Sequence, residues 1–333
     1  MNRKVGPVFL LLFTVLGGAC SWSHPSEQPR AAMNHVALDL ATPSEFVFVA
    51  FGDTRFHDPS DTEPANPAVR QALVSAIDRQ HPAFVSIGGD IVYNGENPKD
   101  WQVWDSETKV WLDHRIPVYP ALGNHDLKGD EKIALENYFA RFPYLNGSRF
   151  YSVRLGHCRM LVLDSALEEL SGPQGEWLRS ELDQLPVEVD FLFLVFHHPP
   201  YTSSSDEKAY GGGHSARAKE QALAKFLEER QQHARARFVV FNGHVHNYER
   251  HEHAGVTYFV TGGGGAHAYP IPREPGDPYK DPGINYHFLL VEVNHNRADV
   301  AMNKLEFKDG KAVWSKADSV TLTAPLAPPA AAD

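Results

Sequence analysis

Short apolar runs alternate with longer amphipathic stretches along most of the chain. The apolar runs have the length and composition of buried β-strands, and they lie at 46–51, 84–87, 117–122, 190–196 and 238–241. The amphipathic stretches have helical spacing, and they lie at 67–80, 101–114, 131–142, 175–185 and 216–233. This alternation predicts an α/β core in which helices connect the strands.

Other apolar runs break this alternation. Residues 149–155 and 159–164 flank Gly156 and His157 and predict a β-hairpin. Later runs at 255–260, 288–293 and 300–307 predict further antiparallel strands. Mixed sheets packed face to face with helices outside satisfy both patterns, so the class is α/β (α+β). The Pro- and Gly-rich segment 270–284 is compatible either with a long loop over a site or with disorder.

The N-terminal stretch has the features of an export signal. Basic residues at 3–4 precede an apolar run at 8–16 that is too short to span a bilayer, and small residues follow at 17–19. Cys20 then resembles the lipidated cysteine of bacterial lipoproteins. We therefore expect a signal peptide at 1–19 and an exported protein, either periplasmic, attached to a membrane through a lipidated Cys20, or secreted.

The remaining chain divides by composition. Residues 20–45 are expected to form a flexible tether, 46–310 one main domain, and 311–333 a C-terminal strand and disordered tail. With 333 residues, 42% of them hydrophobic, the chain can bury one sizeable core. Besides Cys20, the chain has a second cysteine, Cys158, in an apolar stretch, which predicts a buried and inert thiol.

The formal net charge of −11 argues against binding to a nucleic-acid scaffold or to anionic lipid, because both require a basic face. It does not exclude a phosphate ester as substrate, since bound cations would reverse the local field. The sequence gives no expectation for the oligomeric state.

Metal-type ligands follow five of the predicted strands. The groups are carboxylates, an amide oxygen and imidazoles, and they belong to Asp53, Asp90, Asn124, His197, His244 and His246. Strand ends are the usual place for active sites in open sheets. The sequence therefore predicts a site for two metal ions.

The motifs that carry these ligands are Gly52-Asp53, Gly89-Asp90-x-x-Tyr93, Gly123-Asn124-His125-Asp126, His197-His198-Pro-Pro, and Gly-His-Val-His-Asn-Tyr-Glu-Arg at 243–250. Together they resemble the calcineurin-like metallophosphoesterase superfamily, and the details around Tyr93 and 246–250 resemble its purple acid phosphatase branch. The resemblance covers about 46–265 and implies a four-layer αββα sandwich with two mixed β-sheets flanked by helices. It also implies the two ligand sets: Asp53, Asp90, Tyr93 and His246 for the first metal, and Asp90 as a bridge with Asn124, His197 and His244 for the second.

Arg55 departs from the family pattern. Many members have a histidine ligand at this position and purple acid phosphatases have glycine, whereas a guanidinium has no lone pair to donate. The Tyr93 phenolate restores the ligand count and suits a trivalent ion, so we expect iron(III) at the first position and Zn, Mn or Fe(II) at the second. Arg55 could bind the substrate phosphate or form an ion pair beside the metals; both alternatives remain open.

Three anionic ligands against a trivalent and a divalent ion leave the site positively charged. Such a site supplies a metal-activated hydroxide and aligns a phosphate for in-line attack. By resemblance, His125 contacts the phosphate and protonates the leaving group, and Asp126 is expected to orient His125. His214 is a candidate catalytic contact or a solvated loop residue, and His198 is a candidate substrate contact or a packed histidine.

The leading hypothesis is an exported phosphomonoesterase of the acid phosphatase type. A phosphodiesterase or nucleotide phosphohydrolase would use the same metals, because the motifs do not describe the pocket that selects the alcohol group. A non-catalytic metal-binding scaffold of the same fold is a second alternative. A Ser-His-Asp hydrolase is disfavoured because the chain has no Gly-x-Ser-x-Gly elbow.

Overall fold

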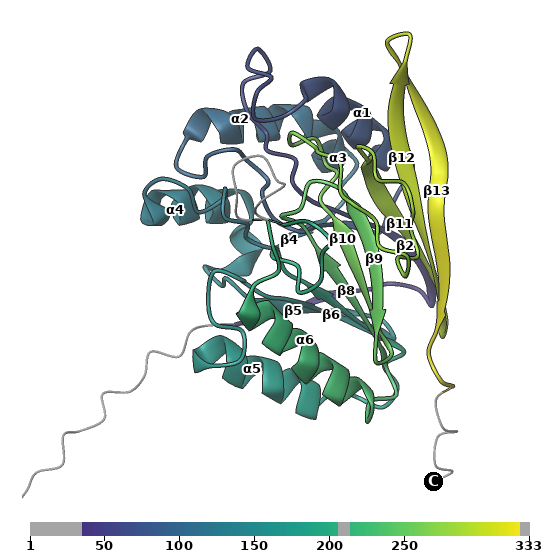
Figure 1. Ribbon diagram of the computed structural model, residues 1–333. Coiled ribbons are helices and arrows are strands. Elements are labelled where there is room, and N and C mark those ends of the chain that lie inside the picture. Colours follow the sequence, from purple (N-terminus) through teal and green to yellow (C-terminus); the bar gives the residue numbers. More distant parts are fainter. Residues whose placement is uncertain (1–34, 206–213, 327–333) are drawn as a thin grey trace, which may run out of the picture. The chain divides into compact units, whose positions relative to one another are not determined.

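The computed structural model describes residues 35–205 and 214–326. Within them, two mixed β-sheets are flanked by helices, as expected (Figure 1). The predicted signal peptide, Cys20 and the last residues of the tail lie outside the described residues. None of the helices in the described ranges is long and apolar enough to cross a membrane.

The larger sheet has seven strands in the order β1-β5-β6-β7-β8-β10-β9. Their bounds are Val36–Leu40 (β1), Tyr151–Leu155 (β5), Cys158–Val162 (β6), Phe191–Val195 (β7), Arg237–Asn242 (β8), Val256–Thr261 (β10) and Tyr248–His253 (β9). The pairs β5–β6 and β10–β9 are antiparallel, and the others are parallel. The hairpin expected across Gly156 and His157 is therefore confirmed.

The smaller sheet has six strands in the order β13-β12-β11-β2-β3-β4. Their bounds are Lys311–Thr323 (β13), Arg297–Lys308 (β12), Tyr286–Asn294 (β11), Glu45–Phe51 (β2), Phe84–Ile87 (β3) and Val118–Pro120 (β4). The strands β2, β3 and β4 are parallel to one another, whereas β11, β12 and β13 pair antiparallel. The parallel strands carry three of the ligand-bearing loops at neighbouring ends.

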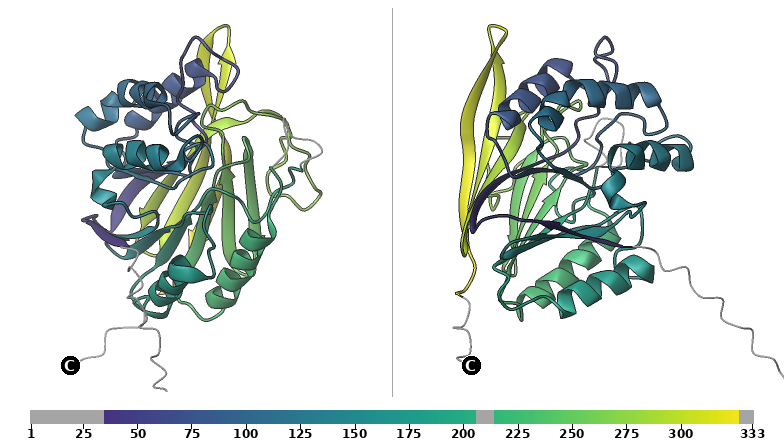
Figure 2. Two further views of the ribbon diagram at one scale, coloured as in Figure 1. Left: turned by 90° about the vertical axis from the view of Figure 1, so that its left-hand side faces the viewer. Right: turned by 180° about the vertical axis from the view of Figure 1, so that it is seen from behind.

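Helices cover the outer faces of the two sheets (Figure 2). They are α1 (Pro67–Asp78), α2 (Pro98–Glu107), α3 (Lys109–Asp113), α4 (Glu131–Arg141), η1 (Pro143–Leu145), α5 (Gly172–Asp183) and α6 (Ala218–Gln231). The predicted helix at 101–114 is divided at Thr108. The Thr108 hydroxyl donates to the Trp104 carbonyl at 2.7 Å, a local hydrogen bond that competes with a continuous helix.

Aromatic side chains fill the space between the sheets. The rings of Phe48 and Phe84 are stacked with centroids 4.7 Å apart, and Phe48 meets Phe193 of the opposite sheet edge-on at 5.0 Å. Burying a Phe side chain contributes about 1.5–3 kcal/mol. This packed layer fixes the two sheets against each other and so fixes the positions of their strand ends.

Two sequence-based expectations differ in part from the structure. The expected tether at 20–45 is wrong at its end, because Val36–Leu40 forms β1 and pairs in parallel with β5. The strand expected at 255–260 was expected to be antiparallel. It is β10, which pairs antiparallel with edge strand β9 at 248–253 but parallel with β8. The segment 270–284 contains no helix or strand; it packs inward through buried Ile271 and Tyr279.

The C-terminal strand is joined to the opposite sheet by polar contacts. Asp318 on β13 accepts hydrogen bonds from the Tyr248 hydroxyl at 2.8 Å and from Arg250 Nε at 2.9 Å, both on β9.

Cys158 is buried in β6, as expected, and burial raises the pKa of its thiol. Such a thiol is held in its unreactive protonated form.

Candidate metal centre

The ligand-bearing loops come from strands of both sheets. Asp53 and Asp90 follow the parallel neighbours β2 and β3, and Asn124 follows β4. His197 and His244 follow the parallel neighbours β7 and β8 of the other sheet. The carboxyl ends of these strands therefore bring the predicted ligands to one place.

The ligands predicted for the second metal are in direct contact. His197 Nε2 lies 3.0 Å from Asn124 Oδ1 and 3.4 Å from Asp90 Oδ1. His244 Nδ1 lies 3.1 Å from the same Asn124 oxygen and 3.3 Å from His197 Nε2. The structure thus brings together one carboxylate, one amide oxygen and two imidazoles, a donor set that suits a divalent transition metal.

Asp53 lies on the other side of this group. It is fully buried, and both of its carboxylate oxygens accept from the His244 main-chain N–H at 3.0 Å. His246 Nε2 lies 3.7 Å from Asp53 Oδ1, while its Nδ1 is hydrogen bonded to the His267 carbonyl at 2.8 Å. The hydrogen bond to the His267 carbonyl therefore orients the His246 ring so that Nε2 is directed at the Asp53 carboxylate.

Four residues of the site have left-handed backbone conformations. Their φ angles are 60° for Asp53, 45° for Arg55, 53° for Asp90 and 69° for His244. Non-glycine residues adopt this region only when the surrounding structure enforces it. Gly123 permits the close approach, since a Cβ there would lie 2.3 Å from Asp90 Oδ1. The tight turns after the strands thus direct these side chains toward one another.

Tyr93 lies at the wall of a cavity of about 540 Å³. Its ring centroid is 5.3 Å from that of His125, and the Lys128 ammonium lies 4.0 Å from the centre of the Tyr93 ring. Other residues that line the cavity include Arg55, Glu63, His214, His246 and Tyr269. A substrate can therefore reach the candidate ligands through this cavity.

Arg55 is paired with a predicted ligand. Its Nη2 and Nε lie 3.1 and 3.3 Å from Asp90 Oδ2, the carboxylate oxygen that faces away from His197. The side chain is 12% exposed and also lines the cavity. Of the two alternatives for Arg55, the ion pair with Asp90 is present. Because Arg55 also lines the cavity, a contact with a phosphate there remains open.

The expected contact between Asp126 and the His125 ring is wrong. Asp126 is fully buried, and its carboxylate accepts from the main-chain N–H groups of Ile91 at 2.9 Å and Gly123 at 2.9 Å. His125 Nδ1 is instead hydrogen bonded to the Tyr93 carbonyl at 2.7 Å. Asp126 therefore shapes the loops that follow β3 and β4, and a main-chain carbonyl orients His125.

His198 and His214 both lie against the ligand group. The ring of His198 is buried, with its centroid 4.3 Å from that of His244, and its Nδ1 is hydrogen bonded to Ser165 Oγ at 2.8 Å. The ring centroid of His214 lies 4.9 Å from that of His244 and 5.3 Å from that of His246. Neither residue has the surroundings of a solvated loop histidine.

The chemistry of the donors fits bound cations. Burial, followed by repulsion from Asp90, raises the pKa of Asp53 well above its usual value, and a nearby cation would relieve both effects. His246 Nε2 is buried and makes no hydrogen bond within the described residues. Burial also lowers the pKa of His197, which favours the neutral imidazole that ligates metals.

Ser165 and Tyr269 belong to the site although no motif marks them. Ser165 follows β6 and holds His198, while the Tyr269 ring lies 5.6 Å from that of His246. Both are single polar residues on loops that follow strands. Their position after a strand was the available signal, but it is shared by many residues that have no role.

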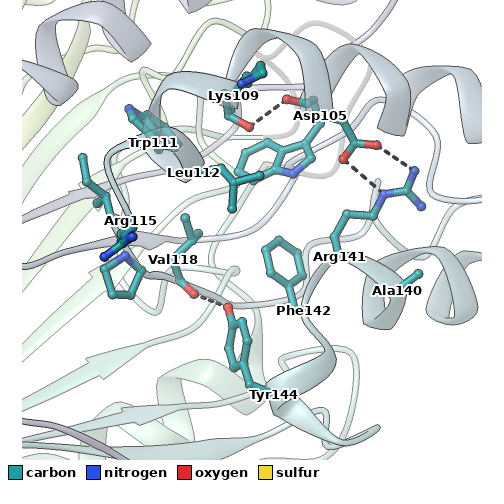
Figure 3. A pocket seen from close by; sticks show the side chains of 14 residues that line it. Asp105, Lys109, Trp111, Leu112, Arg115, Val118, Ala140, Arg141, Phe142 and Tyr144 are labelled. Atoms are coloured by element: carbon teal, nitrogen blue, oxygen red, sulfur yellow. Dashed lines mark hydrogen bonds and ion pairs between the residues drawn. The ribbon is translucent and has the colours of Figure 1, made fainter.

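A separate cavity of about 690 Å³ lies beside α2, α3 and edge strand β4 (Figure 3). Aromatic side chains such as Trp104, Phe142 and Tyr144 line it, and Arg141 there is paired with Asp105 at 3.0 Å. Its lining includes none of the predicted ligands. The metal centre and this cavity are therefore distinct features of the described structure.

Comparisons with known proteins find distant relatives of this chain. Purple acid phosphatase 15 of Arabidopsis thaliana is 26% identical over 198 residues, which is 55% of this chain and 35% of that protein. The phosphoenolpyruvate phosphatase of Allium cepa is 26% identical over 201 residues, covering 56% of this chain and 39% of that protein. The chain thus spans less than half the length of these relatives.

A purple acid phosphatase from yellow lupin (Lupinus luteus) seeds has the same fold, with a TM-score of 0.64 at 18% identity over 85% of this chain and 54% of that one. The calcineurin-like phosphoesterase family model matches residues 46–248, a range that includes every predicted ligand. The chain therefore belongs to the calcineurin-like phosphoesterase family.

Proposed function

We propose that this protein is a dinuclear-metal phosphoester hydrolase that acts on phosphomonoesters. The observation that carries the proposal is the convergence of two buried carboxylates, one amide oxygen and several imidazoles beside a cavity. Structural roles alone rarely require buried carboxylates this close together, because each disfavours ionisation of the other.

The proposed ligand sets are those that the resemblance to the family implies. Asp53, Asp90, Tyr93 and His246 would hold iron(III). Asp90, Asn124, His197 and His244 would hold Zn, Mn or Fe(II). When bound, the two ions would lower the pKa of a coordinated water and stabilise negative charge on the phosphate.

Residues of the chain perform the remaining tasks. Arg55 holds Asp90 through its guanidinium and adds positive charge at the cavity wall, where a phosphate would lie. His125 also lines the cavity, and the Tyr93 carbonyl fixes its ring, so that Nε2 is available to the leaving-group oxygen. His214 lines the same cavity and would contact the phosphate or the leaving group.

The names of the relatives favour a phosphatase over a diesterase. Both describe phosphatases, and one names phosphoenolpyruvate, itself a phosphomonoester. A phosphodiesterase or nucleotide phosphohydrolase on the same metals is the second candidate, because the predicted metal ligands do not determine which alcohol group the cavity accepts.

Paired aryl substrates test this choice. We expect the metal-loaded protein to hydrolyse 4-nitrophenyl phosphate with a kcat/KM at least about tenfold above that for bis(4-nitrophenyl) phosphate, a difference of about 1.4 kcal/mol in transition-state stabilisation. A His197→Ala variant, which lacks a central ligand, serves as the inactive control. A preference for the diester would contradict the phosphomonoesterase proposal and support the second candidate.

Replacement of Tyr93 by Phe tests the iron assignment. If iron(III) binds the phenolate, the iron-loaded parent absorbs visible light by phenolate-to-metal charge transfer, and Tyr93→Phe should abolish that band. Tyr144→Phe, at the separate cavity, should leave it unchanged. A colourless parent that holds only zinc or manganese would refute the iron assignment and leave the hydrolase proposal standing.

We also propose that the protein is exported and that a lipid on Cys20 attaches it to a membrane. The basic, apolar and small residues at 2–19 support this proposal. Labelling with a fatty-acid analogue, compared between the parent and Cys20→Ser, would refute lipidation if neither protein were labelled.

A further inference from the structure

Two of the imidazoles predicted as metal ligands share one arrangement. In His197 and His246, Nδ1 is hydrogen bonded to a main-chain carbonyl, of Gly88 and His267 respectively, each at 2.8 Å. The other nitrogen of each ring is directed at the carboxylates. Metal-ligating histidines are usually fixed in this way, because the outer hydrogen bond sets both the tautomer and the ring orientation.

His198 has the same arrangement, although it follows a predicted ligand directly in the sequence. Its Nδ1 is fixed by Ser165 Oγ at 2.8 Å, and its main-chain N–H donates to the same oxygen at 3.2 Å. The Ser165 carbonyl is held in turn by Arg217 and Lys219, each at 2.8 Å. The ring is therefore held in one orientation by a chain of polar contacts that begins at α6.

The ring of His198 also lies at the proposed second metal position. Its centroid is 4.3 Å from that of His244 and 4.9 Å from that of His197. One ring nitrogen from each of these three histidines lies within 4.8 Å of the others. A single ion can be reached by three imidazoles at this separation after small side-chain movements, since metal–nitrogen bonds are about 2.0–2.1 Å long.

We propose that His198 is an additional ligand of the second metal, beside Asp90, Asn124, His197 and His244. This inference rests on the proposed two-metal site and replaces the substrate contact expected for His198. Three imidazoles make the donor set richer in nitrogen. Imidazole favours zinc over manganese, and carboxylate or carbonyl oxygen favours manganese. The second position is therefore selective for zinc.

Zinc binding measured by competition with a chromophoric chelator tests the proposal. The variant is His198→Asn, whose amide can still donate to Ser165 but provides no imidazole. We expect it to hold one equivalent of zinc as the parent does and to bind the other at least about tenfold more weakly. Its preference for zinc over manganese should also fall. His233→Ala removes an exposed imidazole at the end of α6 and should match the parent.

Cobalt(II) substitution and a second variant provide independent readouts. The visible absorption of the cobalt-loaded protein should change in His198→Asn, because the number of nitrogen ligands falls. Ser165→Ala keeps the imidazole and removes its anchor, so it should weaken zinc binding in the same direction. Its melting temperature reports whether the fold is intact.

The possible failures are distinct. If the parent retains no metal, the two-metal site itself is refuted. If both the parent and His198→Asn bind two equivalents of zinc equally tightly, only the role of His198 is refuted. Unchanged zinc affinity together with weaker inhibition by inorganic phosphate would identify His198 as a phosphate contact and would also overturn the proposal.

Discussion

Asp90→Asn is expected to lose at least one equivalent of metal and to lower kcat/KM at least about a thousandfold, or about 4 kcal/mol. Asp90 is central because one oxygen lies 3.4 Å from His197 Nε2 and the other 3.1 Å from the Arg55 guanidinium. The substitution preserves side-chain size but removes the charge that two cations would share. It also leaves the partly buried Arg55 guanidinium beside a neutral amide, so that its charge repels any bound cation.

Metal content by elemental analysis and kinetics on an aryl phosphate monoester are the two measurements. Asp39→Asn is the matched control, because Asp39 lies on β1 and its side chain is 57% exposed. It should retain both metals and full activity. If Asp90→Asn kept two equivalents of metal and normal turnover, the assignment of Asp90 as the shared ligand would be wrong.

His125→Ala should retain both metals and lose about a hundredfold to ten-thousandfold in kcat, the range for removal of a general acid or base. The two effects separate because the His125 main-chain N–H, which alanine keeps, donates to Asp90 Oδ1 at 2.8 Å. The support of the metal site thus survives while the imidazole is removed from the cavity.

Two substrates with different leaving groups sharpen this experiment. An alkyl phosphate needs its leaving oxygen protonated more than 4-nitrophenyl phosphate does, so the loss should be larger for the alkyl ester. His114→Ala removes a half-exposed imidazole on the α3 side and should behave as the parent. Parent-like turnover of both esters by His125→Ala would contradict the proposed role.

The location of the site could be predicted from sequence because it depends on local patterns. The strands β3 and β7 are buried throughout, so each reads as a continuous apolar run, and a ligand follows directly where the run ends. Because neighbouring parallel strands have their carboxyl ends at the same edge of the sheet, residues that follow such strands lie close together. The class of fold and the convergence of Asp53, Asp90 and Asn124 followed from that.

Strands with polar sequences could not be identified in the same way. β9 reads Tyr-Glu-Arg-His-Glu-His and has buried residues only at its start, because it is the edge of its sheet. β1, also at an edge, is half-buried at alternate positions and follows Pro- and Ala-rich sequence. Strand pairing rather than side-chain burial defines both elements. The partner of β1 is the distant strand β5, whereas β9 pairs with β10, which follows it directly.

The hydrogen-bond partners of individual side chains could not be predicted from the sequence either. The spacing of Asp126 next to His125 favoured a contact between them, yet the Asp126 carboxylate binds main-chain amides of two loops. His198 is held by Ser165, which lies 33 positions earlier in the chain. Such contacts depend on how loops from different strands meet, and no local pattern records that.

The contact of Asp318 with Tyr248 and Arg250 affects where this protein can be shortened. Every predicted ligand lies before residue 248, where the family match ends. However, β9, the strand that follows His246, is hydrogen bonded to β13 through Asp318. A truncated protein ending near 310 would contain all the predicted ligands but would lack this contact between β9 and β13. The smallest unit that keeps the site supported therefore extends through β13, well past the last predicted ligand.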